Sequence, residues 1–160
     1  VLANNGLIYG MPLDSQSVLI IDPEAMTVDT TIITLSSTDK WIGGVLANNG
    51  LIYGIPRDSD SVLIIDPKAM AADTTTISGL DGNNKWIGVV LAANGKVVGI
   101  PYSSNAVLII DPETNTADAT SLAGAGAGNY KYIGGVLAAN SLIYAIPFFA
   151  DNVLVIDVGC

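Results

Sequence analysis

The chain has 160 residues, half of them hydrophobic, and its 15 acidic and 6 basic residues give a net charge of −9. This charge repels phosphate backbones and anionic lipid headgroups, so we expect no nucleic-acid partner and no binding to a membrane surface. Apolar stretches are too short for membrane insertion by a helix. Histidine is absent, which removes the commonest general base and transition-metal ligand, and we expect no metal or other cofactor. The single cysteine, Cys160, cannot form an internal disulfide.

The sequence repeats itself four times. The segment VLANNGLIYG at residues 1–10 recurs unchanged at residues 45–54 and returns with substitutions from Val90 and Val136, so the starts lie 44, 45 and 46 residues apart. We divide a single domain, residues 1–160, into repeats 1–44, 45–89, 90–135 and 136–160, of which the last is incomplete. The length changes fall in the connection between successive repeats, as is typical of an exposed loop.

Each repeat is predicted to contain four short strands and no helix. In the second repeat the first strand covers residues 41–47, and the following Asn-Asn-Gly predicts a type I′ hairpin turn. The second strand covers residues 51–55 and ends at Pro56, which cannot donate to a β-ladder. The third covers residues 62–65, and the Thr-rich residues 74–78 are predicted as the fourth.

The third strand, Val-Leu-Ile-Ile, is apolar at consecutive positions, which predicts that both of its faces are buried. An antiparallel unit of about 45 residues with both faces buried needs neighbouring sheets, as in a β-propeller of four-stranded blades. The pairs Gly43-Gly44 and Gly134-Gly135 suit an innermost strand, where blades crowd the axis. A β-solenoid and a β-sandwich are the alternatives, although hairpin turns disfavour the first and a sandwich does not need four copies of one sequence.

Residues 44–76 resemble the YVTN and NHL-like class of propeller repeats. The resemblance rests on a Gly-Val-hydrophobic strand, an Asn-Gly turn, a hydrophobic-Tyr strand and the run Ser-Val-Leu-Ile-Ile-Asp-Pro, and the other repeats carry it nearly as well. The class includes surface-layer, extracellular-binding and scaffold proteins, and its more distant members are enzymes. The resemblance therefore implies a propeller fold and an extracellular or cell-surface location. Lys-Trp-Ile-Gly departs from the usual start of the inner strand.

The chain begins inside an inner strand and ends before the fourth outer strand, so it holds about three and a half to four blades. An open stack would expose two apolar faces. We expect a second copy to complete an eight-bladed ring, as a homodimer, or the chain to be a fragment of a longer propeller. A four-bladed ring closed by one chain is a further alternative.

A lysine and an aromatic residue recur at the start of each inner strand. On a propeller they ring the axial opening, where they could stack a sugar or hold an anion. In the alternative interpretation the aromatic residue packs between blades while the lysine reaches solvent. These axial candidates are Lys40, Trp41, Lys85, Trp86, Lys131 and Tyr132.

The loop after the second strand keeps its length but changes its chemistry between repeats. Such loops suit a rigid scaffold whose recognition lies on its connections, although unconstrained surface positions vary in the same way. The loop candidates are Arg57, Asp58, Asp60, Tyr102, Phe148 and Phe149.

These features favour a non-enzymatic binding scaffold that displays variable loops on a ring, with a glycan or a protein as ligand. Catalysis usually needs one asymmetric site with a perturbed base, whereas the ionisable residues here are mostly repeated. The glutamates, Glu24 and Glu113, occupy equivalent turns. A propeller-type hydrolase, lactonase or lyase with an axial site and a structural surface-array protein are the alternatives.

Overall fold

The computed structural model describes residues 1–36 and 41–159, which form strands, turns and bends without a helix, and hence without a helix that could cross a membrane. Consecutive strands build four antiparallel sheets. The first sheet contains β1 (Ile8–Gly10), β2 (Leu19–Asp22) and β3 (Thr27–Asp29), and the second β4 (Trp41–Leu46), β5 (Ile52–Pro56), β6 (Leu63–Asp66) and β7 (Ala71–Asp73). The third contains β8 (Trp86–Leu91), β9 (Val97–Pro101), β10 (Leu108–Asp111) and β11 (Thr116–Asp118), and the fourth β12 (Tyr132–Leu137), β13 (Ile143–Pro147) and β14 (Leu154–Ile156).

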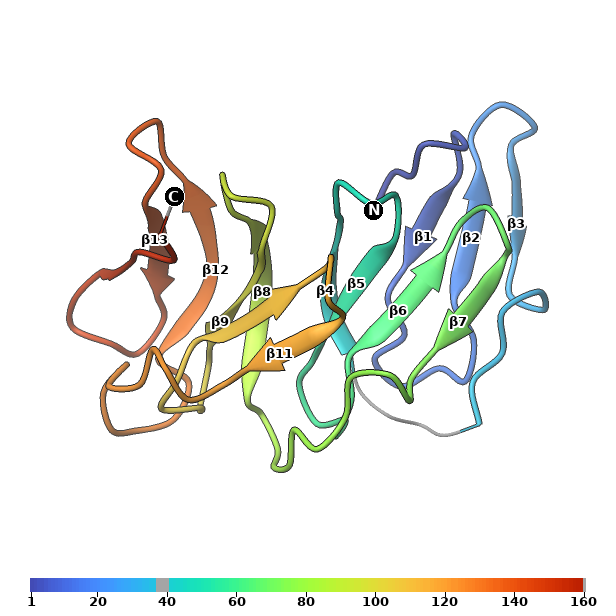
Figure 1. The fold of residues 1–160 in the computed structure, drawn as a ribbon. Helices are drawn as coiled ribbons and strands as arrows, with labels where there is room; N and C mark the ends of the chain where they lie inside the picture. The colour runs from blue at the N-terminus through green and yellow to red at the C-terminus, as the bar shows by residue number, and fades with distance from the viewer. Residues whose placement is uncertain (37–40, 160) are drawn as a thin grey trace.

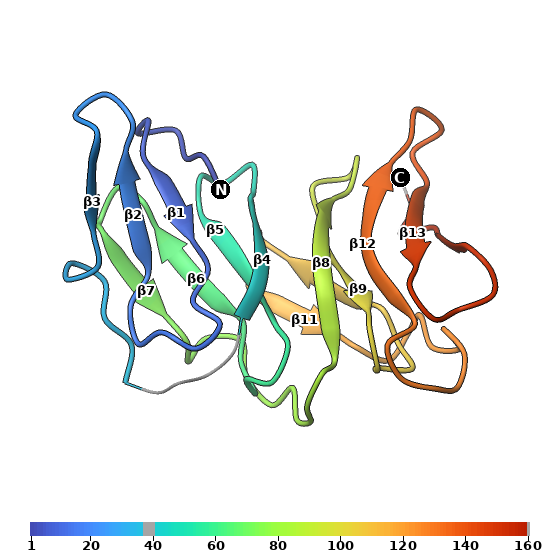
Figure 2. The same ribbon diagram turned by 180° about the vertical axis from the view of Figure 1, so that it is seen from behind.

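The four sheets stand side by side in chain order, with the first and last sheets at opposite ends of the row (Figure 1). Strand β8 lies between β4 and β12, and the view from behind shows these three inner strands along the middle of the molecule (Figure 2). Sheets arranged in this way are the blades of a β-propeller, so the predicted fold class is confirmed. Closure of a ring by a second chain stays a prediction.

The hairpin between the first two strands of each blade differs from the predicted type I′ turn. The Ala47 N–H donates to the Leu51 carbonyl at 2.9 Å, and the Gly50 N–H donates to the Ala47 carbonyl at 3.0 Å. Within residues 47–51, all of which are described, the positive φ falls on Gly50, at 84°. This is a three-residue loop closed by a left-handed residue, which is glycine in the first three blades and Ser141 in the fourth. Asn49 instead accepts the Leu51 N–H on its side-chain oxygen, at 3.0 Å.

The fourth strand lies earlier than predicted. It is β7, whereas residues 74–78 follow it as a bend and an isolated bridge. The Asp73 carboxylate accepts the N–H groups of Thr75 and Thr76 at 2.6 and 3.2 Å, and it also accepts the Thr76 hydroxyl. These side-chain bonds replace ladder bonds and turn the chain, against the β propensity of threonine. The equivalent aspartates of the first and third repeats bond in the same way.

The third strand is buried on both faces in the second blade, as predicted. Leu63 and Ile65 pack toward the first blade and Ile64 packs toward the third. In the terminal blades the same strand has one exposed face, where Leu19 is 38% and Val155 is 50% exposed. The prediction of two buried faces therefore holds where a blade has neighbours on both sides.

The blades approach each other most closely through their inner strands. Gly88 has a φ of 85°, and a Cβ atom placed on it would lie 2.5 Å from the Cα atom of Gly134 in the next blade. No side chain fits at that distance, so β8 and β12 can pack this closely only because residue 88 is glycine. The expectation that the innermost strand needs glycine because the blades crowd there is confirmed. The closest approach is at Gly88, however, which is followed by a valine and does not belong to a Gly-Gly pair.

Candidate functional site

One face of the propeller carries the loop after each second strand together with the connection that enters the next blade. We call it the loop face. The Lys85 N–H donates to the Arg57 carbonyl and the Tyr102 N–H donates to the Lys85 carbonyl, both at 2.9 Å. The pattern continues as Lys131 donates to Tyr102 and Phe148 donates to Lys131, both at 2.7 Å. These bonds fix Arg57, Tyr102 and Phe148 as equivalent positions on successive blades.

The axial candidates are buried. Trp41, Trp86 and Tyr132 are 1%, 3% and 4% exposed, and Lys85 and Lys131 are each 5% exposed. The indole N–H groups of Trp41 and Trp86 donate to the carbonyls of Ser61 and Ala106, at 2.7 and 2.8 Å. The Tyr132 hydroxyl donates to Asn152 at 3.1 Å. Lys40 lies outside the described residues.

The packing interpretation expected the axial lysines to reach solvent. The two that the structure describes bind protein oxygens instead. The Lys85 ammonium donates to the carbonyls of Ser59 and Gly82 at 2.9 and 2.5 Å. The Lys131 ammonium donates to the carbonyls of Ser104 and Gly128 at 2.9 and 3.0 Å. Each lysine therefore ties the loop of one blade to the connection that enters the next. Ligand binding by the axial set stays a prediction, and this geometry does not favour it.

Burial lowers the pKa of both lysines, because the charged ammonium group loses hydration. For Lys85 the nearby carboxylates of Asp60, Asp58 and Asp81 act in the opposite direction and raise the pKa, though by less than burial lowers it. The two lysines differ in this respect, because burial is the one cause that shifts the pKa of Lys131.

Between the second and third blades the loop face is polar. The Arg57 guanidinium donates to the side-chain oxygen of Asn84 at 2.6 and 3.0 Å, and the Asp58 carboxylate accepts the Asn84 N–H at 2.6 Å. Arg57 and Asp58 also form a loose ion pair at 3.7 Å. Asp60 is exposed, and its carbonyl accepts the Leu80 N–H at 2.9 Å. The structure thus brings three of the loop candidates into one junction, where Arg57 and Asp58 bind Asn84.

Between the third and fourth blades the same positions carry aromatic rings. The Tyr102 ring lies 4.9 Å from Tyr130 and 6.3 Å from Phe148 between centroids. The Phe149 ring lies 4.7 Å from Phe148 and 6.3 Å from Tyr130. Tyr130, Phe148 and Phe149 are 41%, 52% and 70% exposed. We call these four residues the aromatic patch; it unites three loop candidates from two blades.

Tyr130 was not among the predicted candidates. It occupies the position of Asn84, directly before the axial lysine, and both residues have a left-handed backbone with φ of 61° and 52°. Asparagine tolerates this conformation, whereas a bulky tyrosine adopts it rarely. The Phe149 N–H donates to the Tyr130 carbonyl at 3.1 Å, which helps to hold that conformation. The backbone therefore places the Tyr130 ring in the patch at a conformational cost.

A hollow of about 290 Å³ adjoins the patch. Residues 125–129 form one side of it, and Phe149, Asp151 and Asn152 form the other. Asp151 and Asn152 are exposed, so polar oxygen and nitrogen atoms lie beside the exposed rings. Exposed rings next to a few polar groups in a concave surface are typical of a small-ligand site.

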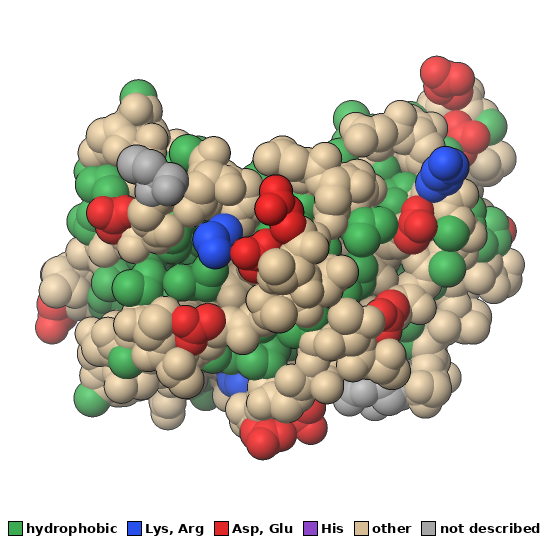
Figure 3. Space-filling view, viewed as in Figure 1, with side chains coloured by type: hydrophobic (Ala, Val, Ile, Leu, Met, Phe, Trp, Pro, Cys, Tyr) green, Lys and Arg blue, Asp and Glu red, His purple; other side chains and the backbone are tan. Residues whose placement is uncertain are grey.

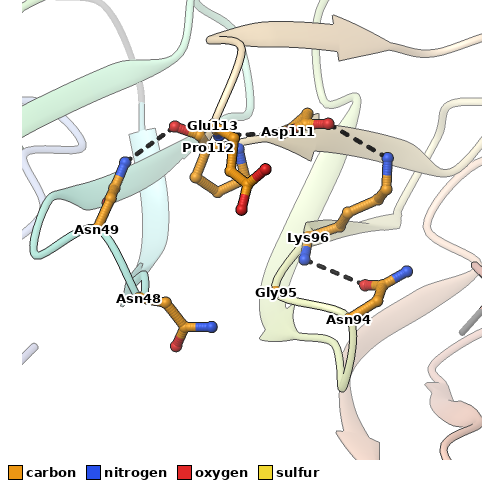
Figure 4. Close-up of a pocket in the computed structure, with 8 residues that line it drawn as sticks. All are labelled: Asn48, Asn49, Asn94, Gly95, Lys96, Asp111, Pro112 and Glu113. Carbon is orange, nitrogen blue, oxygen red and sulfur yellow. Dashed lines mark hydrogen bonds and ion pairs between the residues drawn. The ribbon is translucent and has the colours of Figure 1, made fainter.

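A larger crevice, of about 340 Å³, lies on the opposite face between the second and third blades (Figure 4). Asn49 donates to the Pro112 carbonyl at 3.0 Å across it, and Lys96 pairs with Asp111 at 3.4 Å. Glu113 also lines it. The Asn49 amide and the Asp111 carboxylate of this crevice already serve the contact between blades and the turn after β10. Across the described residues 1–36 and 41–159, no group of three or more acidic or cysteine side chains is placed to hold a metal ion.

A scan against protein-family models and a search of curated proteins each found no match. Solved structures do match. Virginiamycin B lyase from Staphylococcus aureus superposes with a TM-score of 0.73 at 10% identity over 99% of this chain. The extracellular domain of a B. thetaiotaomicron protein assigned as a one-component system gives 0.68 at 16% identity over 97%. A Bacteroides uniformis protein assigned as a 6-phosphogluconolactonase gives 0.68 at 13% identity over 97%.

These similarities confirm the β-propeller fold and, at such low identities, the fold alone. The chain spans 54%, 19% and 48% of the three matched structures, so it corresponds to about half of each of the two shorter propellers. The matched structures include both an extracellular domain and proteins described as enzymes. A functional conclusion for this chain therefore has to come from its own loop face.

Proposed function

We propose that the protein is a non-enzymatic binding module that recognises a neutral glycan through the aromatic patch on its loop face. The observation that carries the proposal is the assembly of four rings from two blades and their connection, of which three are at least 41% exposed. We further assign the repeat to the YVTN and NHL-like class, on the strength of its strand and turn motifs.

The chemistry of the patch suits a sugar better than a charged ligand. Exposed aromatic rings offer flat apolar surfaces on which the C–H face of a sugar ring can stack. Asp151 and Asn152 beside the hollow can bond sugar hydroxyls, because a carboxylate accepts hydrogen bonds and an amide does both. The net charge of −9 opposes an anionic ligand.

Binding is favoured over catalysis because the two lysines with lowered pKa are not free to react. The lysines with lowered pKa, Lys85 and Lys131, are buried and bound to backbone carbonyls. Glu113, one of the two glutamates, lies in the crevice on the opposite face from the patch. A general acid or base has to reach its substrate, and these groups do not meet that condition at the patch.

The experiment is a glycan array followed by calorimetric titration of the best neutral glycan. We expect Tyr102→Ala and Phe149→Ala each to weaken binding by roughly 5- to 30-fold, as expected when a stacking contact of about 1–2 kcal/mol is lost. Arg57→Ala is the matched control, because Arg57 holds the position of Tyr102 one blade earlier. It should leave the affinity unchanged.

Three results would contradict the proposal. An array without any bound neutral glycan, together with capture of a peptide at the same rings, would indicate a protein ligand. Equal losses in Tyr102→Ala and Arg57→Ala would place the site elsewhere. Turnover of a lactone or a glycoside by the purified chain would favour the enzymatic alternative.

A further inference from the structure

The contacts between neighbouring blades are copies of one interface. In each case the forward face of one blade packs against the backward face of the next. Tyr53, Val62 and Ile64 of the second blade meet Val97, Leu108 and Ile110 of the third. The equivalent residues pair between the first and second blades and between the third and fourth. A blade of this repeat is therefore built to receive another blade of the same repeat on each side.

A polar contact repeats along with the apolar one. The side-chain amide of an asparagine in the first hairpin donates to a carbonyl in the last turn of the next blade. The donor–acceptor pairs are Asn5 with Pro67 at 2.9 Å, Asn49 with Pro112 at 3.0 Å and Asn94 with Val158 at 3.1 Å.

The series predicts one more pair. The next asparagine is Asn140, which donates to the Tyr144 hydroxyl of its own blade at 2.9 Å. The first member of the acceptor series is the carbonyl of Pro23, in the exposed last turn of the first blade. Asn140 lies in the turn between β12 and β13, and Pro23 lies in the turn between β2 and β3. These strands belong to the blades at opposite ends of the row, so the two residues do not meet within one chain (Figure 1).

A second contact follows the same order. The Tyr9 hydroxyl reaches the Met70 sulfur of the next blade at 3.2 Å, and the Tyr53 hydroxyl reaches the Asn115 side chain at 3.0 Å. The third blade has Val98 at this position, and the tyrosine returns as Tyr144 in the fourth. The residue equivalent to Met70 in the first blade is Met26, which is 90% exposed.

The two terminal faces are apolar and exposed. On the forward face of the last blade Val136, Ile146, Val153 and Val155 are between 47% and 61% exposed. On the backward face of the first blade Leu2, Leu19 and Val28 are between 38% and 70% exposed. Figure 3 shows hydrophobic side chains in green over the last blade, at the left end of the molecule.

We propose that these two faces bind each other between two copies of the chain, head to tail. The forward face of the fourth blade of each copy covers the backward face of the first blade of the other, with Asn140 donating to Pro23 and Tyr144 contacting Met26 across the seam. Two identical seams then close a two-fold ring of eight blades. The occupant is a second copy because both halves of the repeated interface are present on this chain.

The test is the mass of the chain in solution, by sedimentation velocity. The wild-type chain should sediment as a dimer. Val155→Glu blocks the forward face and Leu19→Glu blocks the backward face, and each variant should sediment as a monomer. Phe149→Glu, an exposed apolar residue of the loop face, is the control and should remain dimeric. A circular dichroism spectrum confirms that each variant is folded.

Mixing the two blocked variants tests the head-to-tail geometry. Each retains the face that the other lacks, so an equimolar mixture should form a one-to-one dimer although neither variant associates alone. If one variant dimerises with itself, the pairing is face to face and the proposal is wrong. A monomeric wild-type chain overturns it as well, and further blades on a longer polypeptide would then cover the faces.

A covalent test does not depend on the stability of the blocked variants. With Cys160→Ser as background, Asn140→Cys combined with Pro23→Cys should yield a disulfide-linked dimer under mild oxidation. Asn140→Cys combined with Asp60→Cys is the negative control, because Asp60 is exposed on the loop face of the second blade, away from the seam. Absence of the cross-link in the first variant contradicts the seam.

Discussion

Replacing Gly88 by alanine tests how closely the blades pack at the axis. The added Cβ atom would lie 2.5 Å from the Cα atom and 2.7 Å from the backbone nitrogen of Gly134. Both are backbone atoms, so β8 and β12 have to move apart, and overpacking of this kind costs about 1–3 kcal/mol. The φ of 85° adds roughly 1–2 kcal/mol for a residue with a side chain. We expect Gly88→Ala to lower the free energy of unfolding by about 2–5 kcal/mol.

Gly134→Ala is the matched control, because Gly134 holds the same position in the next blade with a φ of 74° and no atom within 4 Å of its added Cβ. It should cost only the conformational part, roughly 1–2 kcal/mol. Urea denaturation followed by tryptophan fluorescence measures both variants. Equal losses of stability in Gly88→Ala and Gly134→Ala would refute the argument that the close approach of blades demands glycine.

Two further predictions concern pH. Hydrogen bonds from Thr76 and Thr75 lower the pKa of Asp73 from 3.8 to about 2, so this carboxylate stabilises the fold above pH 3.8 and the contribution is lost as the pH falls through about 2. Asp73→Ala should therefore flatten the acid part of the stability–pH curve, measured by urea denaturation, and an unchanged acid slope would contradict this. Burial lowers the pKa of Lys85 below 10.5, so the unfolded chain binds more protons and stability rises with alkaline pH. Lys85→Met should make that rise smaller, leaving the part that comes from Lys131, and it should cost about 1–3 kcal/mol, because the carbonyls of Ser59 and Gly82 lose their donor; a variant as stable as the wild-type chain would show that the contact is dispensable.

The architecture could be predicted because the clearest pattern in the sequence, its short apolar runs, reflects the interaction that contributes most to the fold, the burial of apolar side chains. Four apolar residues in succession, as at positions 62–65, have to be covered on both faces, and that requirement alone implies a neighbouring sheet on each side. The fourth strand was misplaced for the converse reason. Propensity favours the threonines of residues 74–78, yet a single carboxylate at Asp73 binds two backbone N–H groups and outweighs it.

The candidate site could be predicted only in part. Variation between equivalent loops identified Tyr102, Phe148 and Phe149, which the structure assembles into one patch. Tyr130 was missed because it lies in the connection of variable length, where the repeats do not align; the available signal was its place directly before the lysine, matching Asn84. The burial of Lys85 depends on carbonyls from two loops, which no pattern of residue types specifies.

The most direct test of the proposed site is a titration that observes the aromatic rings themselves, by NMR of the chain with labelled tyrosine and phenylalanine. Added glycan should shift the ring signals of Tyr102, Tyr130, Phe148 and Phe149 in parallel, at one dissociation constant, while the buried Tyr9 and Tyr53 signals stay in place. Shifts confined to rings outside the patch, with those four unmoved under saturating glycan, would contradict the account.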